Sequence, residues 1–147
     1  MLQVLYDGHC FGCGERNPDG LGMRFVDQGG ESVCEFTVDG RFQSWAGIVH
    51  GGIVSLLLDE AVGWAAWHAG HPGVTAKLEV RLRQPLRIGD PVRVSGRVLS
   101  HRHRLIQTSA AIDRAADGSR VAEATASLIA TPTAIRPDSG LPGSPTR

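Results

Sequence analysis

The sequence has little of what marks secreted, membrane or nucleic-acid-binding proteins. Its three cysteines are odd in number and too few for a disulfide framework, which fits a reducing compartment. No stretch approaches about 20 uninterrupted apolar residues, and no basic flank leads into an apolar run at the start. Lysine plus arginine and aspartate plus glutamate number 15 each, so no overall field attracts nucleic acid or an anionic membrane. We therefore expect a cytoplasmic protein that binds neither.

The length and composition predict a single domain followed by a tail. A chain of 147 residues is within the common range for one compact domain, which we assign to residues 1–131. Residues 132–147 are rich in proline, glycine and serine and show no hydrophobic periodicity. This composition is typical of a disordered terminus.

One segment predicts a long buried helix. It begins at the HGG sequence of residues 50–52 and runs for about 17 residues, or ~25 Å, until Gly70 and Pro72 stop it. Apolar residues surround the helix on almost every side, so the rest of the fold must cover it all round.

The remaining segments predict antiparallel strands in hairpin connection. Their order with the helix is β-β-α-β-β-β-β, and an α+β fold in which a curved antiparallel sheet of about six strands wraps one long central helix satisfies it most simply. This architecture is the hotdog fold. The expected strands are 21–28, 31–38, 74–83, 92–100, 105–114 and 120–131.

Two features of the helix suggest chemistry. The glycine pair Gly51 and Gly52 leaves free backbone N–H groups at the positive end of the helix dipole, where an oxyanion could bind, although such a pair can also simply permit close packing. Asp59 and Glu60 are the only charges in the helix, and burying a carboxylate is costly without water, a partner or a substrate. Adjacent helical residues point about 100° apart, so we expect only one of the two in any one cleft.

Three blocks of the chain resemble hotdog thioesterases of the phenylacetate-degradation (PaaI-like) family. The helix start, GIVHGGIVSLLLDE at residues 47–60, is similar to the GxxHGG…D pattern of that family. The blocks CFGCGERNPDGLGMRF (10–25) and VTAKLEVRLRQPLRIGD (74–90) look like one bacterial branch of it. The resemblance spans about residues 10–131 and implies an acyl-CoA thioesterase acting on small or aromatic acyl groups.

The resemblance also implies a homodimer, or a dimer of dimers, with each active site shared between two chains. Gly51, with Gly52, would polarise the thioester carbonyl through backbone N–H groups, while Asp59 of the partner chain would activate water or attack directly. Thr75 matches a Ser or Thr that orients the water in relatives. A side chain ahead of the glycines often holds the carbonyl, and here Gln43 is preferred to Ser44 because its NH₂ group donates.

Other residues are weaker candidates. His50 precedes the glycines and is expected to fix the turn and border the substrate instead of exchanging protons. Trp45 is the expected aromatic of the acyl pocket, and Glu60 is expected to border the substrate. Trp64 and Trp67 are assigned to packing. The arginines that could pair with coenzyme A phosphates are Arg81, Arg83, Arg93, Arg97, Arg102 and Arg104, with no basis for a choice among them.

No metal or cofactor is predicted. Cys10 and Cys13 have half of a zinc-site spacing, but no second CxxC or paired histidine follows. We expect a loop structured around reduced cysteines.

Three alternative functions remain. A non-catalytic acyl-CoA-binding module would gain nothing from a carboxylate at Asp59. A thioesterase acting on acyl carrier protein would need a basic docking patch. A hotdog dehydratase would need an HFPG-like block, which is not present, and a histidine facing the helix carboxylate.

Overall fold

The computed structural model describes residues 3–135, and within them one long helix and eight strands. A short 3-10 helix, Gly40–Phe42, precedes the long helix α1, Gly51–His68. The strands are β1 Val4–Tyr6, β2 Val26–Asp27, β3 Ser32–Thr37, β4 Gly73–Leu82, β5 Pro91–Arg102, β6 Leu105–Arg114, β7 Arg120–Ala130 and β8 Thr133–Ile135.

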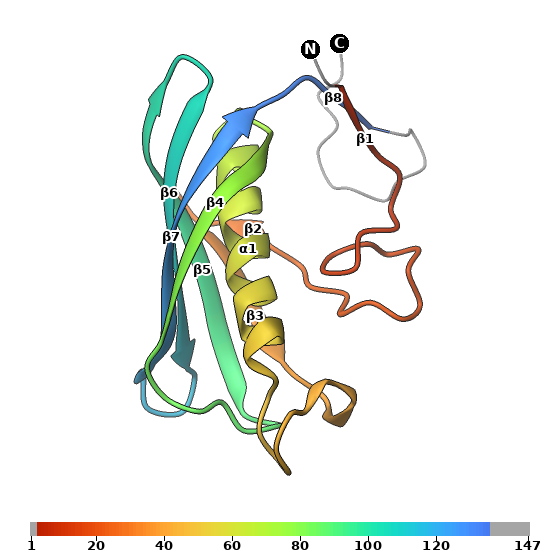
Figure 1. Cartoon of the computed structure of the whole chain (residues 1–147), viewed down its shortest axis with the longest axis vertical. Coiled ribbons are helices and arrows are strands. Elements are labelled where there is room, and N and C mark those ends of the chain that lie inside the picture. Colours follow the sequence, from red (N-terminus) through yellow and green to blue (C-terminus); the bar gives the residue numbers. More distant parts are fainter. Residues whose placement is uncertain (1–2, 136–147) are drawn as a thin grey trace.

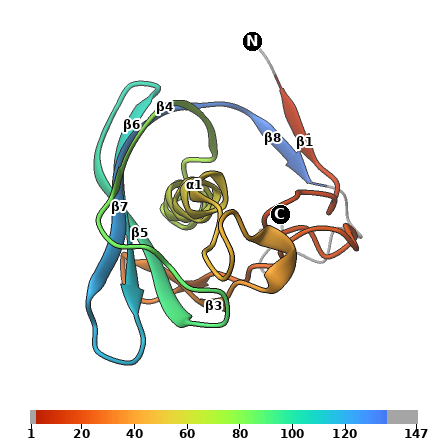
Figure 2. The ribbon, with the colours of Figure 1, turned by 60° about the horizontal axis from the view of Figure 1, so that its bottom comes forward.

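Six of the strands form one antiparallel sheet in the order β2-β3-β5-β6-β7-β4. The sheet curves around α1, as Figures 1 and 2 show. The long strands β5, β6 and β7 lie at its centre, while β2 and β4 are its two edges. The predicted hotdog architecture is therefore confirmed.

Helix α1 begins and ends where the sequence predicts. His50 is the N-cap, and its ring Nδ1 accepts a hydrogen bond from the Gly52 N–H at 2.9 Å. Gly70 has a φ of +82°, a left-handed conformation that suits glycine and stops the helix. The face turned to the sheet is fully buried and consists of Val54, Leu57, Leu58, Ala61, Val62, Ala65 and Ala66. No helix in the described part of the chain is long and apolar enough to cross a membrane.

The helix and sheet approach most closely where α1 crosses β5. A Cβ placed on Gly96 would lie 2.3 Å from the Ala61 carbonyl oxygen, which belongs to the helix backbone. Backbone cannot yield as a flexible side chain can, so only glycine fits at this crossing. The two residues are small because the helix must lie deep in the curve of the sheet.

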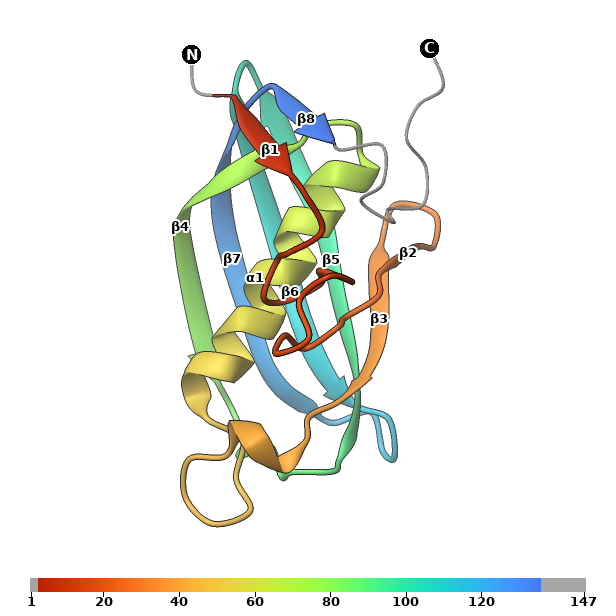
Figure 3. The same ribbon diagram turned by 90° about the vertical axis from the view of Figure 1, so that its right-hand side faces the viewer.

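The N-terminal segment covers the side of α1 that the sheet leaves open (Figure 3). Phe25 stacks on Trp64 of the helix with ring centroids 6.3 Å apart. The predicted strand 21–28 is reduced to β2, because Leu21 and Met23 donate their N–H groups to the carbonyls of Phe11 and Gly12 instead. These hydrogen bonds fold the segment into a loop over the helix.

The predicted boundary between domain and tail needs a correction. Thr133–Ile135, assigned to the tail, forms β8 and pairs in parallel with β1. This pair could not be predicted from the sequence because each strand has only three residues, too few for a periodic pattern. The rest of the predicted tail, 136–147, lies outside the described residues.

Strand β4 departs from simple alternation near its start. Its register against β7 shifts between Thr75 and Lys77, so Ala76 is an extra, exposed residue in a β-bulge. Simple alternation along the strand would put Ala76 on the same face as Leu78 and Val80. The bulge instead turns Thr75 to the same side as Leu78, toward α1, where it hydrogen-bonds to Asp59.

The close approach at Gly96 makes a stability prediction. Gly96→Ala should lower the free energy of unfolding by about 1–3 kcal/mol or more, because the new methyl group overpacks against helix backbone. Gly63→Ala is the matched control, since a Cβ there meets nothing within 4 Å and alanine favours the helix by about 0.5–1 kcal/mol. Urea unfolding of both variants checks the difference, and equal stability would contradict the packing described.

Candidate active site

Asp59 projects from α1 toward the start of β4. The Thr75 hydroxyl donates a hydrogen bond of 2.8 Å to Asp59 Oδ1, and both residues are half-buried. Among the described residues no lysine or arginine forms an ion pair with Asp59. The bulge at Ala76 brings Thr75 into this position, so a hydrogen bond to a strand residue holds one carboxylate oxygen while the other stays available.

A cleft of about 490 Å³ opens beside Asp59. Carbon atoms make up most of its wall, which consists of α1, the start of β4 and the N-terminal segment. Trp64 and Trp67 line the cleft together with Tyr6 and Val74. The volume of the cleft and its apolar wall suit a small organic ligand. A second groove between α1 and β4 also borders Asp59 and Thr75 and extends to Gly52 and Leu78.

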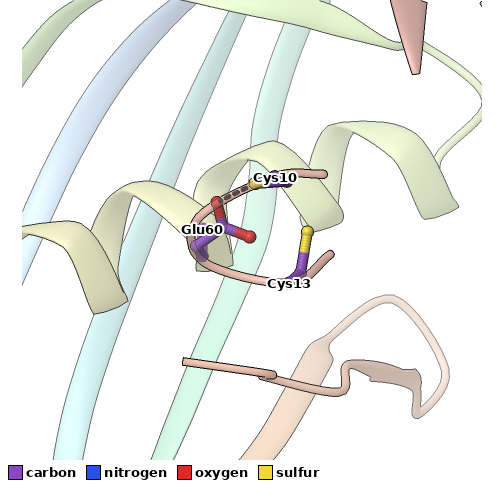
Figure 4. Close-up of side chains that lie close together, drawn as sticks. All are labelled: Cys10, Cys13 and Glu60. Carbon is purple, nitrogen blue, oxygen red and sulfur yellow. Dashed lines mark hydrogen bonds between the residues drawn. The ribbon is translucent and has the colours of Figure 1, made fainter. Parts of the chain in front are cut away.

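Glu60 borders the same cleft as Asp59, contrary to the expectation that only one would. Its carboxylate turns to the N-terminal loop, where the Cys10 thiol lies 3.3 Å from Glu60 Oε1 in a hydrogen bond (Figure 4). Burial raises the pKa of Glu60 to about 8, and the neighbouring Cys10 adds to the effect. The pKa of the Cys13 thiol is raised as well, by its own side-chain hydrogen bond with Cys10 and by burial.

The start of α1 presents one free donor. The Gly52 N–H is taken by the His50 ring, so the expected contribution of Gly52 to an oxyanion hole is not available in this arrangement. The N–H groups of Ile53 and Val54 both donate to the His50 carbonyl. In the described part of the chain nothing accepts from the Gly51 N–H, which leaves it as the donor for a ligand.

The loop before the helix carries the other predicted residues. Gln43 Oε1 accepts from the Gly47 N–H at 3.2 Å, and the Ser44 hydroxyl donates to the Ile48 carbonyl at 3.4 Å. Neither side chain borders the cleft at Asp59. Trp45 at the loop tip is 84% exposed and does not border the cleft of the single chain, so its place in the acyl pocket stays a prediction.

The arginines considered for phosphate binding lie elsewhere. Arg93 and Arg97 alternate with residues of β5 that face α1, so they lie on the opposite face of the sheet, where both pair with Glu31. Arg83 pairs with Glu123. None of the six arginines borders the cleft.

The residues of α1 that line the cleft were not predicted as a group. Glu60, Gly63, Trp64 and Trp67 recur at spacings of three and four, so they form one stripe along α1 that faces the cleft. The spacing of this stripe can be read in the sequence. Because the helix is apolar on every side, however, the sequence does not show which stripe faces a cleft. The two tryptophans that were assigned to packing therefore line the cleft.

Comparisons with known proteins identify the family of the chain. The family model of the thioesterase superfamily matches residues 46–119, just over half of the chain. The chain is 26% identical over 96 residues to acyl-coenzyme A thioesterase 13 of Homo sapiens, with 64% of this chain and 69% of that protein covered. The protein of the same name from Pongo abelii gives the same values.

Solved structures show the same fold. A crystal structure of a thioesterase superfamily protein has a TM-score of 0.75 at 28% identity, covering 79% of this chain, which spans only 60% of that one. Zebra fish thioesterase superfamily member 2 has a TM-score of 0.71 at 20% identity, covering 80% of this chain and 89% of its own. A Streptococcus mutans protein bound to acetyl CoA has a TM-score of 0.70 at 19% identity, with 76% and 90% covered. The chain thus belongs to the thioesterase superfamily, and the prediction of a hotdog-fold thioester hydrolase is confirmed.

Proposed function

We propose that the protein is an acyl-CoA thioesterase in which Asp59 is the catalytic carboxylate. The observation that carries the proposal is the carboxylate itself, half-buried beside an apolar cleft, held through one oxygen by Thr75 and unpaired with any lysine or arginine in the described chain. A group this costly to bury has no structural ion pair to account for it.

The reaction needs a base or nucleophile and a donor for the carbonyl oxygen. Asp59 either removes a proton from a water molecule that adds to the thioester carbon, or adds to that carbon itself. The carbon–sulfur bond then breaks, and coenzyme A leaves as a thiol while the acyl group leaves as a carboxylic acid. The Thr75 hydroxyl fixes the carboxylate, which leaves Oδ2 of Asp59 to face the substrate.

The Gly51 N–H supplies the donor for the oxygen that becomes negative. It lies at the positive end of α1 and has no acceptor among the described residues. Gly51 and Asp59 are eight positions apart on one helix, about 12 Å along its axis. A reacting carbonyl lies about 3 Å from both its donor and its attacking group, so one chain cannot supply both.

A second copy of the chain would supply the group that one chain holds too far away. Strand β4 is a sheet edge with exposed Val74 and Leu82, and an edge strand of ten residues is a template for pairing. Gly51 lies beside Leu82 at one end of β4, while Asp59 is bonded to Thr75 near the other. Two copies of β4 paired antiparallel about a two-fold axis would bring the Gly51 of one chain toward the Asp59 of the other.

The substrate class follows from the cleft and from the relatives. The curated relatives are named acyl-coenzyme A thioesterases, and one structural relative holds acetyl CoA. The apolar cleft beside Asp59, with Trp64, Trp67 and Tyr6, suits a small or aromatic acyl group, as in the phenylacetate-degradation family that the sequence resembles.

Asp59→Asn should lower thiol release from acyl-CoA by about 10²- to 10⁴-fold, because the amide cannot accept a proton or add to the carbonyl. Release of free coenzyme A from acetyl, medium-chain and phenylacetyl thioesters measures this. Glu35→Gln, which changes an exposed carboxylate on β3 away from the cleft and from the β4 edge, is the matched control and should keep wild-type rates.

Two results would contradict the assignment. A folded Asp59→Asn protein with unchanged turnover would exclude Asp59 as the catalytic group. Tight acyl-CoA binding without turnover in the wild type would indicate a binding module, whereas turnover confined to acyl carrier protein thioesters would change the substrate class.

Gly51→Pro should lower kcat by about 10²- to 10³-fold, the effect of losing one oxyanion donor. Proline replaces the N–H with a ring that suits the first helical position, and a Cβ at residue 51 meets only Leu82 Cδ1, at 3.4 Å. His50 already has the extended conformation (φ −58°, ψ 132°) required before proline. Gly51→Ala keeps the N–H and is the control.

The shared site predicts that two inactive variants complement each other. When Gly51→Pro and Asp59→Asn chains are refolded together, half of the dimers are mixed and each has one intact site, so about a quarter of wild-type turnover should return. Turnover no higher than that of the separate variants would place both groups of a site in one chain.

His50→Ala should cost about 0.5–2 kcal/mol of stability through loss of the helix cap, while His50→Asn should keep both the cap and turnover. Urea unfolding and thiol release measured on the same samples separate the two roles. If both variants lose turnover equally while remaining folded, His50 exchanges protons instead of capping.

A further inference from the structure

The loop of residues 8–14 brings two cysteines against Glu60, a grouping that the proposed hydrolysis does not use. One ligand atom from each of Cys10, Cys13 and Glu60 lies within 4.8 Å of the others, and the Cys10 sulfur is 3.3 Å from Glu60 Oε1. Figure 4 shows both sulfur atoms near the Glu60 carboxylate. The cysteines and the glutamate are about 50 positions apart, so only the fold joins them.

The loop has the shape needed to hold this carboxylate between the two cysteines. A Cβ on Gly12 would lie 2.3 Å from Glu60 Cδ, so glycine is the residue that lets the carboxylate approach. The backbone turns tightly here, with the Gly14 N–H donating to the Cys10 carbonyl at 2.8 Å. The Cys13 side chain, followed by the backbone of Cys13 and Gly12, lowers the pKa of the Cys10 thiol although burial opposes this.

The charges of the cluster are not balanced within the described chain. Two thiols and a carboxyl group face one another, and no lysine or arginine there forms an ion pair with Glu60. The Tyr6 hydroxyl lies 4.0 Å from the Cys13 sulfur. The cluster must therefore retain protons or bind a cation.

We infer that Cys10, Cys13 and Glu60 bind a divalent transition-metal ion, with zinc the best match. Two thiolates and one carboxylate favour zinc over magnesium or calcium, which prefer oxygen ligands alone. Zinc–sulfur bonds of about 2.3 Å in a tetrahedron place two sulfurs about 3.8 Å apart, so the donors need to close by only about 1 Å. Binding releases the protons of the two thiols and any proton on Glu60.

The site opens on the cleft. All three residues line the same cleft as Asp59, so the fourth tetrahedral position faces it and would hold a water molecule. The ion would tie the N-terminal loop to α1 and fix the cleft wall formed by Tyr6, Cys10 and Cys13. Asp59 and Thr75 are not among its ligands, so the hydrolysis proposed above does not require the ion.

Cobalt substitution tests the site without reference to activity. The full-length protein, reduced and freed of metal, is titrated with Co²⁺, and we expect one ion per chain, thiolate-to-cobalt charge-transfer absorption in the near ultraviolet and intense visible bands of tetrahedral cobalt. Zn²⁺ should displace the cobalt and raise Tm. Cys10→Ser and Cys13→Ser should each weaken binding by at least about 100-fold.

Two further variants keep the test decisive. Gly12→Ala leaves all three ligands in the chain but moves the Glu60 carboxylate, so it should weaken cobalt binding while both thiols still react with a thiol reagent. Cys34→Ala removes the buried cysteine of β3, which is outside the cluster, and should leave the spectrum unchanged.

Three outcomes would overturn the inference. The first is the lack of a tetrahedral cobalt spectrum in the folded, reduced wild type. The second is cobalt binding by Cys13→Ser that equals that of the wild type. The third is an equal loss of cobalt binding in Cys34→Ala and Cys10→Ser. Recovery of a Cys10–Cys13 disulfide, with no metal binding after reduction, would identify a redox pair in place of a metal site.

Discussion

The structure depends on covering a helix that has no polar face. Helix α1 buries one side in the curve of a six-stranded sheet, and at Gly96 the contact is so close that helix backbone meets strand backbone. The N-terminal segment covers the other side. Two carboxylates interrupt this apolar surface, and each faces one of the elements that cover the helix. Asp59 faces β4, and Glu60 faces the N-terminal loop.

The position of each carboxylate determines what it can do. Asp59 reaches the edge strand, where a bulge turns Thr75 inward to orient it and where a second chain can pair. Glu60 is one residue further, about 100° around the helix, and meets two cysteine sulfurs. In our proposals one helix therefore supplies both a hydrolytic carboxylate, which needs a partner chain, and a carboxylate ligand for a metal ion. Both border one cleft, so the loop that the metal would fix is also the wall that the substrate would contact.

The sequence predicted the fold well because its signals were local and strong. The apolar run from residue 51, the glycine at 70 and the period-two strands each reflect one element. Thr75 and Asp59 were predicted from family resemblance, and their hydrogen bond agrees with it. The tests of hydrolysis will show whether their roles follow.

Contacts between distant parts of the chain could not be predicted from the sequence. The bulge at Ala76, the pairing of β8 with β1 and the meeting of Glu60 with Cys10 and Cys13 all depend on distant segments. Trp45 was placed in the pocket because it is near the glycines in sequence, but its loop points it to solvent.

We propose that the Gly51 N–H of one chain and Asp59 of another act on one thioester. A crystal structure with a non-hydrolysable acyl-CoA analogue, in which a methylene group separates the sulfur from the carbonyl, would show both contacts. We expect the carbonyl oxygen about 3 Å from the Gly51 nitrogen of one subunit, with the carbonyl carbon facing the Asp59 carboxylate of the other. A carbonyl bound by groups of a single subunit, or one that reaches neither group, would contradict it.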